Sequence, residues 1–113
     1  MSLPNLKTAV AVSPDGTRIL TGISSDLKSA SAVILGEPGL LIGLSINTDG
    51  TNDAQAILYD NASSASGSVL AKCFISAATG NSTILFPVPI RADNGIYLAH
   101  TGTGATAVIW YTA

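Results

Sequence analysis

Charged side chains are scarce in this sequence. Lys, Arg, Asp and Glu make up 11% of its 113 residues, against about 25% in an average soluble domain. The five basic residues are scattered along the chain, so no phosphate-binding patch forms and we expect no nucleic-acid partner. Charge normally keeps small domains apart, so a neutral exterior protects only weakly against association. We therefore expect part of the surface to be covered by copies of the chain or by another partner.

Cysteine and histidine occur once each, as Cys73 and His100. A single cysteine forms neither an intramolecular disulfide nor a thiolate metal site, and the apolar neighbours of Cys73 favour a place in the core. With one histidine and no Gly-x-Ser-x-Gly elbow, a catalytic set is missing. On an alternating strand His100 shares a face with Ile96 and Leu98, near the strand end. We assign no catalytic, cofactor or metal residue and expect no enzyme activity.

Long hydrophobic runs are also missing. The most apolar stretch, residues 32–46, is shorter than the roughly 18 to 20 residues of a membrane-spanning helix and is interrupted by Glu37-Pro-Gly39. A basic start followed by an apolar run, which marks a secretory signal, is not evident. We expect no membrane partner.

Glycine (11 residues) and proline (5 residues) divide the chain into short runs rich in Val, Ile, Leu and Tyr. No run keeps a 3.6-residue period over three turns, so the pattern predicts strands. Counting the runs gives about eight strands, and we predict an all-β fold, an antiparallel β-sandwich of jelly-roll type. The length fits one domain, residues 1–113, in which residues 1–7 are a candidate for an extended N-terminal arm.

Turn signals predict which strands are neighbours. The sequence SPDG at residues 13–16 predicts a reversal between strands at residues 8–12 and 17–22. Residues 36–39 (GEPG) predict a hairpin whose arms are almost continuously apolar, so both arms are expected in the centre of a sheet. Pro87 and Pro89 cannot donate hydrogen bonds to a ladder, which favours a sheet edge for the extended run around them.

The run AQAILYD at residues 54–60 alternates. One predicted face carries Ala54, Ala56, Leu58 and Asp60, and the other carries Gln55, Ile57 and Tyr59.

Residues 102–107 (GTGATA) match the glycine pattern of a dinucleotide-binding loop. That loop must open a helix and be followed about 20 residues later by an acidic residue, and neither follows here. Gly102 and Gly104 instead predict a tight hairpin with positive φ, between strands at residues 96–101 and 105–112. We expect aromatic contacts across this hairpin, made by Tyr97, Trp110 and Tyr111.

Three polar segments are candidate sites that turn chemistry also explains. Residues 47–53 (NTDGTND) carry Asn47, Asp49 and Asp53 but match the calcium-hand pattern poorly, because Gly50 follows only two alternating ligands. Asp60-Asn61 and Asp93-Asn-Gly95 stand where apolar runs end or begin, and Asn-Gly is a strong turn signal. We interpret all three as turns and expect no cofactor.

Five motifs occur in order over the second half of the chain: LYDN at residues 58–61, GSVLA at 67–71, PVP at 87–89, NGIY at 94–97 and TGTGA at 101–105. Together they resemble a set of short virion proteins of tailed bacteriophages. The resemblance implies a virion structural protein, most simply a capsid decoration or cement protein on the capsid exterior, made in the host cytoplasm. Its implied partners are the major capsid protein and further copies of the chain. A homotrimer is favoured, since shells offer sites of local threefold symmetry.

A second function of a different class stays open. The chain could be a receptor- or glycan-binding module of a head or tail fibre, in which the loops at residues 47–53 and 61–68 would make the contacts. A small hydrolase ranks behind both, because the sequence lacks an acid-base constellation.

Overall fold

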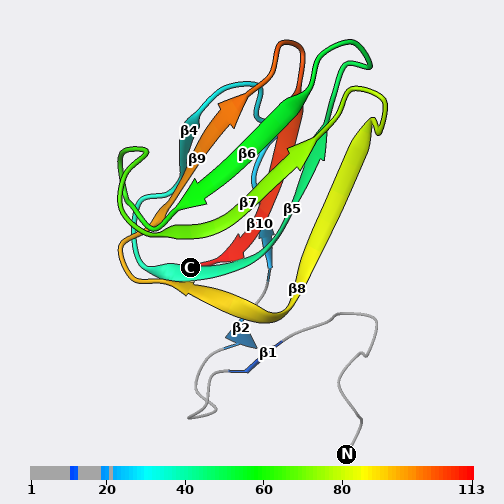
Figure 1. Cartoon of the computed structure of the whole chain (residues 1–113). Helices are drawn as coiled ribbons and strands as arrows, with labels where there is room; N and C mark the ends of the chain where they lie inside the picture. Colours follow the sequence, from blue (N-terminus) through cyan, green and yellow to red (C-terminus); the bar gives the residue numbers. More distant parts are fainter. Residues whose placement is uncertain (1–10, 13–18, 21) are drawn as a thin grey trace, which may run out of the picture.

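The computed structural model describes residues 11–12, 19–20 and 22–113, and two antiparallel sheets of four strands make up most of it (Figure 1). Sheet 1 has the order β3-β10-β5-β8 and sheet 2 the order β4-β9-β6-β7. The strands of sheet 1 are β3 (Ile23–Ser24), β10 (Thr106–Thr112), β5 (Gly39–Asn47) and β8 (Asn81–Ala92). The strands of sheet 2 are β4 (Ala32–Leu35), β9 (Ile96–Thr101), β6 (Ala54–Tyr59) and β7 (Val69–Ile75). The predicted all-β sandwich is confirmed.

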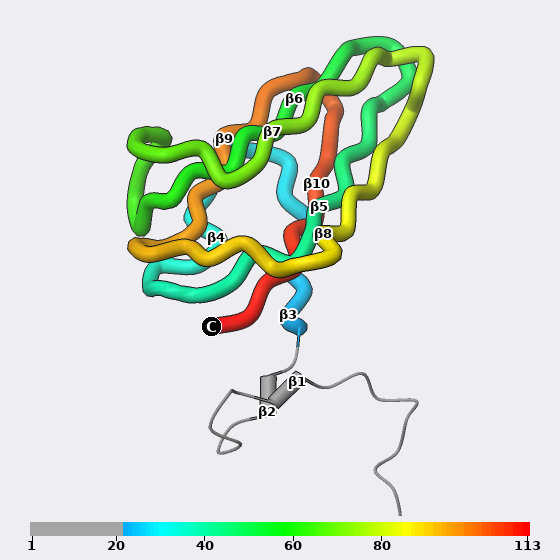
Figure 2. The backbone as a smooth tube through the Cα atoms, turned by 60° about the horizontal axis from the view of Figure 1, so that its bottom comes forward, coloured from blue at the N-terminus to red at the C-terminus, as the bar shows by residue number. Residues whose placement is uncertain are grey.

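The strand pairs are nested in the sequence. β6 pairs with β7, β5 with β8, β4 with β9 and β3 with β10. The chain is therefore one long hairpin with its tip between β6 and β7, and successive pairs lie alternately in sheet 2 and sheet 1. Figure 2 shows the result, in which the backbone passes repeatedly from one layer to the other. Such a rolled hairpin is a jelly roll, so this prediction is confirmed too.

Two predicted hairpins are wrong. Residues 36–38 join strands of different sheets: β4 lies at an edge of sheet 2 beside β9, whereas only β5 is central, between β10 and β8. The segments at residues 96–101 and 105–112 likewise do not pair with each other, because β9 lies in sheet 2 and β10 in sheet 1. A reversal between two sheets uses the same turn residues as a reversal within one sheet, so turn chemistry alone does not distinguish them.

The contacts predicted between the aromatic residues of the last two strands are therefore also wrong. Tyr97 lies opposite Val33 and Tyr59. Trp110 and Tyr111 lie in sheet 1, where Trp110 stands opposite Ser24 and Gly43, and Tyr111 opposite Ile23 and Leu41.

Ahead of the sandwich, β1 (Ala11–Val12) and β2 (Ile19–Leu20) form a separate two-stranded antiparallel ribbon. Ala11 stands opposite Leu20, so the predicted pairing across residues 13–16 is confirmed for the residues that the structure describes. The turn itself and the candidate arm at residues 1–7 lie outside the described residues.

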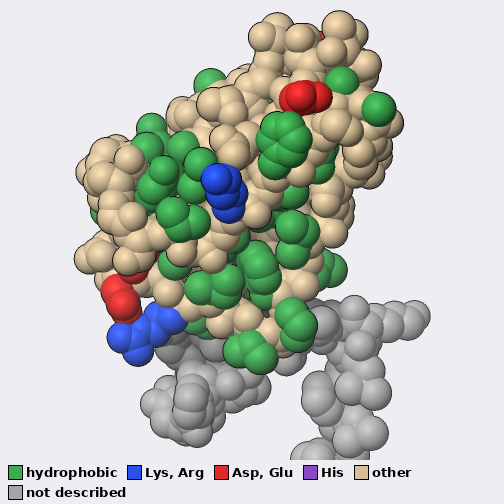
Figure 3. Space-filling model, in the orientation of Figure 1, with side chains coloured by type: hydrophobic (Ala, Val, Ile, Leu, Met, Phe, Trp, Pro, Cys, Tyr) green, Lys and Arg blue, Asp and Glu red, His purple; other side chains and the backbone are tan. Residues whose placement is uncertain are grey.

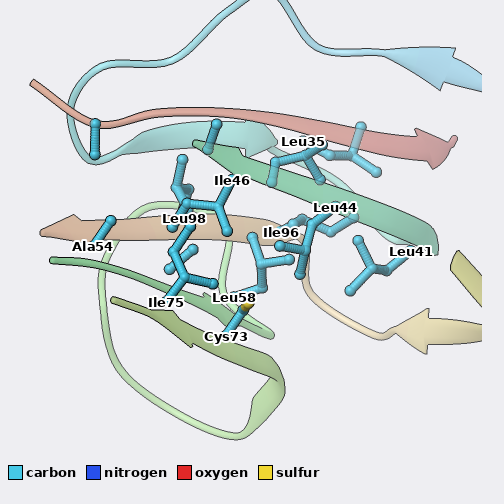
Figure 4. Packing of buried hydrophobic residues seen from close by; sticks show 14 of the residues in the cluster. Leu35, Leu41, Leu44, Ile46, Ala54, Leu58, Cys73, Ile75, Ile96 and Leu98 are labelled. Atoms are coloured by element: carbon cyan, nitrogen blue, oxygen red, sulfur yellow. The ribbon is translucent and has the colours of Figure 1, made fainter. Parts of the chain in front are cut away.

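The core lies between the two sheets and is built from the inward side chains of both (Figure 4). Ala54, Ala56 and Leu58, which share one face in the predicted alternation of β6, are buried, and Cys73 is buried as predicted. Leucine and isoleucine supply the largest fully buried side chains, which are Leu41, Leu44, Ile46, Leu58, Ile96, Leu98 and Ile109. Their removal from water is the main stabilising term of the fold.

β8 is the edge strand that its prolines predict. Leu41 pairs with Ile90 and Gly43 pairs with Leu85, so residues 86–89 form a bulge opposite a single residue of β5. Figure 1 shows β5 and β8 bending together at this point. The bulge removes both prolines from the ladder, so their missing N–H groups leave no rung unmade.

Candidate interaction surface

A row of apolar and aromatic side chains crosses the outer side of sheet 2. The register places Tyr97 beside Val33 on β4 and beside Tyr59 on β6, and Tyr59 beside Val69 on β7. Val33 and Val69, at the two ends of the row, are 43% and 53% exposed. The two tyrosines between them are half-buried. The row therefore covers the full width of the sheet.

Two further rows complete this side of sheet 2. We call the three rows together the outer face, which consists of Val33, Tyr97, Tyr59 and Val69, then Ala99, Ile57 and Lys72, then Thr101, Gln55 and Phe74. Phe74 is 61% exposed, and Lys72 is the one charged side chain of the outer face. Figure 3 shows hydrophobic side chains gathered over β6 and β7 with one basic side chain among them.

The outer side of sheet 1 is mixed. Leu85 and Trp110 lie on either side of Gly43 there. Toward the other end, Asn47 of β5 lies opposite Asn81, and Ser45 lies opposite Thr83, with their hydroxyl oxygens 3.1 Å apart. Antiparallel sheets ordinarily turn such a polar side toward water. Sheet 2 departs from this pattern, because its second side is apolar too. A contiguous exposed apolar patch of this kind marks an interaction site in soluble proteins.

A second exposed apolar surface lies on β8. We call it the β8 ridge, and it consists of Leu85, Pro87, Val88 and Pro89, all of them exposed. Leu85 is 65% exposed and Val88 76% exposed. The ridge belongs to the edge of sheet 1, whereas the outer face belongs to sheet 2. The two surfaces therefore lie on different sheets, although their edge strands β7 and β8 contact each other.

The acidic residues of the loop at residues 47–53 are engaged within the chain. The Asp49 Oδ1 atom accepts hydrogen bonds from the N–H groups of Thr51 and Asn52, both at 2.8 Å. These donors, first Asn52 and then Thr51, lower the pKa of Asp49. Asp53 Oδ1 accepts the N–H of Ala77 at 2.8 Å. Among the described residues no three His, Cys, Asp or Glu side chains gather as metal ligands.

The other polar segments organise the opposite end of the sandwich. Asp60 Oδ1 accepts the N–H of Asn94 at 2.8 Å. Burial acts to raise the pKa of Asp60, but the N–H groups of Asn94, Asp93 and Gly95 together outweigh burial, and the pKa falls below its usual value. The Asn61 amide accepts hydrogen bonds from the N–H groups of residues 63 and 64 and donates to Ser66. The LYDN and NGIY motifs are therefore joined here by the hydrogen bond from Asn94 to Asp60.

The TGTGA motif lies at the other end of the sandwich, against the loop at residues 47–53. Gly102 and Gly104 have φ values of 123° and 72°, so the predicted positive φ is confirmed, and β10 rather than a helix follows. A Cβ atom on Gly104 would lie 2.6 Å from Asp49 Oδ2, and one on Gly102 would lie 2.6 Å from the Asp53 carbonyl oxygen. The glycines let this turn pack against the loop at residues 47–53.

His100 lies on the inner side of β9, as its predicted partners Ile96 and Leu98 do. Its backbone N–H donates to Ser31 Oγ at 2.9 Å, whereas its Nε2 atom is buried with no hydrogen-bond partner. Burial lowers the pKa of the imidazole. The ring is a core group on the side of the sheet away from the outer face.

The two loops considered for receptor contacts lie far from each other. Residues 47–53 precede β6 and residues 61–68 follow it, so the loops stand at opposite ends of the sandwich (Figure 1). One small ligand therefore cannot contact both.

Sequence reasoning missed the outer face. A signal was present in residues 54–59, where Ile57 and Tyr59 occupy the side of the strand that faces away from the core. In the part of the chain that the structure describes, no helix is long and apolar enough to cross a bilayer. No family model matches the chain, and neither a curated protein nor a solved structure matches it. The resemblance to phage virion proteins rests on the five sequence motifs.

Proposed function

We propose that this chain is a non-enzymatic virion structural protein of a tailed bacteriophage, and more narrowly a capsid decoration or cement protein on the capsid exterior. The observation that carries the proposal is the presence of two exposed apolar surfaces on different sheets, the outer face and the β8 ridge. A protein built into a lattice needs at least two contact surfaces, one for each kind of neighbour. The five motifs and the jelly-roll fold, which recurs in viral capsid domains, support the same proposal.

In this role the chain would bind the major capsid protein and its own copies, with a trimer favoured at sites of local threefold symmetry. Each apolar contact needs to be only modest, because many copies act together on one shell. The contacts would oppose separation of capsid subunits under the pressure of the packaged genome. Both surfaces are nearly uncharged, so we expect binding to the shell to be insensitive to salt.

Phage particles that lack the gene for this chain provide the test. The purified chain is added to such particles, bound chain is measured by cosedimentation, and the temperature of DNA release is recorded with and without it. We expect saturable binding, little change between about 50 mM and 500 mM salt, and a higher release temperature. Val88→Lys on the β8 ridge should weaken shell binding. Particles that are equally robust without the chain and do not bind it would refute the proposal.

If the chain is instead a fibre module, the experiment on particles that lack it should give the opposite result. It would bind host cells or immobilised glycans while leaving the stability of the head unchanged. Glycan-array and cell-adsorption measurements on the purified chain separate the two functions, since a decoration protein gives neither signal.

A further inference from the structure

We infer that the outer face of sheet 2 packs against the same face of a second copy of this chain. The most exposed apolar side chains of the outer face stand on its two edge strands, Val33 on β4 and Val69 and Phe74 on β7. Tyr59 and Tyr97 stand half-buried between them, as amphipathic groups that tolerate both water and an interface. The apolar residues therefore reach both edges of the face, with Lys72, Gln55 and Thr101 among them.

The size of the outer face suits a small interface. Its four strands, about 4.8 Å apart, and the six residues of β6, about 3.3 Å each, span roughly 19 by 20 Å, or roughly 380 Å² in outline. A standard interface buries about 800 Å² of accessible surface on each partner, so a contact through this face is at the small end of the range.

The shape of the face favours an identical partner. Every β-sheet twists with the same hand, and two sheets pack face to face when their twists match, with strands roughly 30° apart. Two copies of sheet 2 have the same twist by construction, so a twofold axis in the plane between them satisfies this requirement. The same packing already joins sheet 1 to sheet 2 inside the chain.

Charge also points to a second copy. The outer face holds one cation, Lys72, and no anion, which gives a charged partner such as nucleic acid or an acidic peptide little to recognise. Two ion pairs of the described residues, Lys28 with Asp26 and Arg91 with Asp93, lie outside this face. An almost neutral face meets its own copy without strong repulsion.

This inference deepens the proposed function by naming the partner at one of its two surfaces. It is measured on the purified chain without any shell, so the two can fail separately. A chain that associates through the outer face but binds no capsid keeps the inference and refutes the function.

The test is the mass of the chain in solution, by sedimentation velocity and light scattering from about 1 to 500 µM. Phe74→Lys introduces a charge at a 61% exposed position, where folding tolerates it. The matched control, Leu85→Lys, makes the same kind of change at a 65% exposed position of the β8 ridge. We expect the unmodified chain and Leu85→Lys to form a dimer, because a face that packs against itself about a twofold axis accepts one partner, and Phe74→Lys to raise the dissociation constant at least about 30-fold.

Far-UV circular dichroism of each variant confirms that the β-sandwich is retained. A second variant, Val33→Lys, places the charge on the opposite edge strand and should have the same effect as Phe74→Lys. A monomeric unmodified chain at the highest concentration overturns the inference. So does an oligomer that resists both outer-face variants, or one that Leu85→Lys dissociates equally well.

Discussion

His100 lies on the inner side of β9 with its Nε2 atom buried and unpartnered. A buried polar atom without a hydrogen bond loses its solvation and gains nothing in return, which costs about 1 to 3 kcal/mol. Burial also disfavours the charged ring and lowers the pKa of His100. The residue therefore links the stability of the fold to pH.

The sign of that link follows from the direction of the shift. The imidazole pKa in the folded chain lies below the value of 6.5 expected when the chain is unfolded, so the unfolded chain takes up a proton first as pH falls. The contribution of His100 is fully present above about pH 7 and decreases as pH falls below 6.5. Replacing the ring by an apolar side chain, His100→Leu, should remove this decrease.

Urea unfolding of both chains at about pH 7.5, 6.5 and 5.5 checks the prediction. This window lies above the range in which Asp49 and Asp60 titrate, because the pKa values of both are lowered. Equal pH dependence of the two chains would contradict it.

Single residues were also where sequence reasoning worked best. The burial of Cys73 follows from its apolar neighbours, and the division of β6 into two faces and the face of His100 follow from alternation along one strand. The missing partner of His100 Nε2 could not be predicted, because it depends on side chains that two sheets bring together.

At the scale of elements, the edge of sheet 1 beside β3 shows how side chains extend a short strand. β3 is only two residues long, yet the pairing with β10 continues beyond it. Ser25 N–H donates to the Ile109 carbonyl oxygen at 2.8 Å, and Ile109 N–H donates to Ser25 Oγ at 2.9 Å. Lys28 and Ala107 then exchange two backbone hydrogen bonds. In one hydrogen bond of this ladder, the acceptor of the Ile109 N–H group is therefore the Ser25 hydroxyl oxygen instead of a backbone carbonyl oxygen.

Ser25→Ala should remove that hydrogen bond and leave the partly buried N–H of Ile109 without an acceptor. The expected loss in the free energy of unfolding is about 1 to 2 kcal/mol. Ser24→Ala is the matched control, since the exposed Ser24 hydroxyl hydrogen-bonds, among the residues that the structure describes, only to the carbonyl oxygen of the next residue, and should change stability by less than about 0.5 kcal/mol. Chemical denaturation measures both, and equal losses would show that the hydroxyl of Ser25 is not this acceptor.

The sequence predicts which segments form strands and turns better than it predicts which strands pair. Pro87 and Pro89 placed β8 at an edge because a missing N–H group is a local property with one structural outcome. Residues 36–38 and 102–105 were identified as reversals, but each reversal crosses between sheets. The partner of a strand depends on residues far away in the sequence, and no local signal encodes it.

At the scale of the whole molecule, nested pairing makes most contacts distant in sequence. Ile23 lies opposite Tyr111, whereas the β6 and β7 strands at the tip are joined by a loop of nine residues, 60–68. Closing long loops costs entropy before their contacts form, so such folds are slow. We expect the tip hairpin to form early and the β3–β10 pair to form late.

Two identical substitutions test this order. Ile75→Val in β7 and Ile109→Val in β10 each remove one buried methylene and should cost about 0.5 to 1.5 kcal/mol. The first should mainly slow refolding, because it weakens the tip, and the second should mainly speed unfolding. Stopped-flow folding and unfolding rates, expected in the millisecond to second range, measure both. The reverse assignment of effects would contradict the expected order.

The outer face belongs to this scale as well. Val33, Tyr59, Val69 and Tyr97 come from four segments that only the nested pairing aligns in one row. Alternation could have indicated that Ile57 and Tyr59 point away from the core. It could not have shown that their neighbours across the sheet are apolar too.

The position of β3 beside β10 has a mechanical consequence. The two strands are antiparallel neighbours, so the start of the sandwich at Ile23 lies beside its end at Tyr111. A force that pulls these ends apart acts across the strands, and it breaks the hydrogen bonds of the pair one after another, as a zipper opens. A force that enters through the broad sides of the sheets is shared among many bonds at once. The sandwich is therefore expected to resist loads on its sides and to peel under tension between its ends.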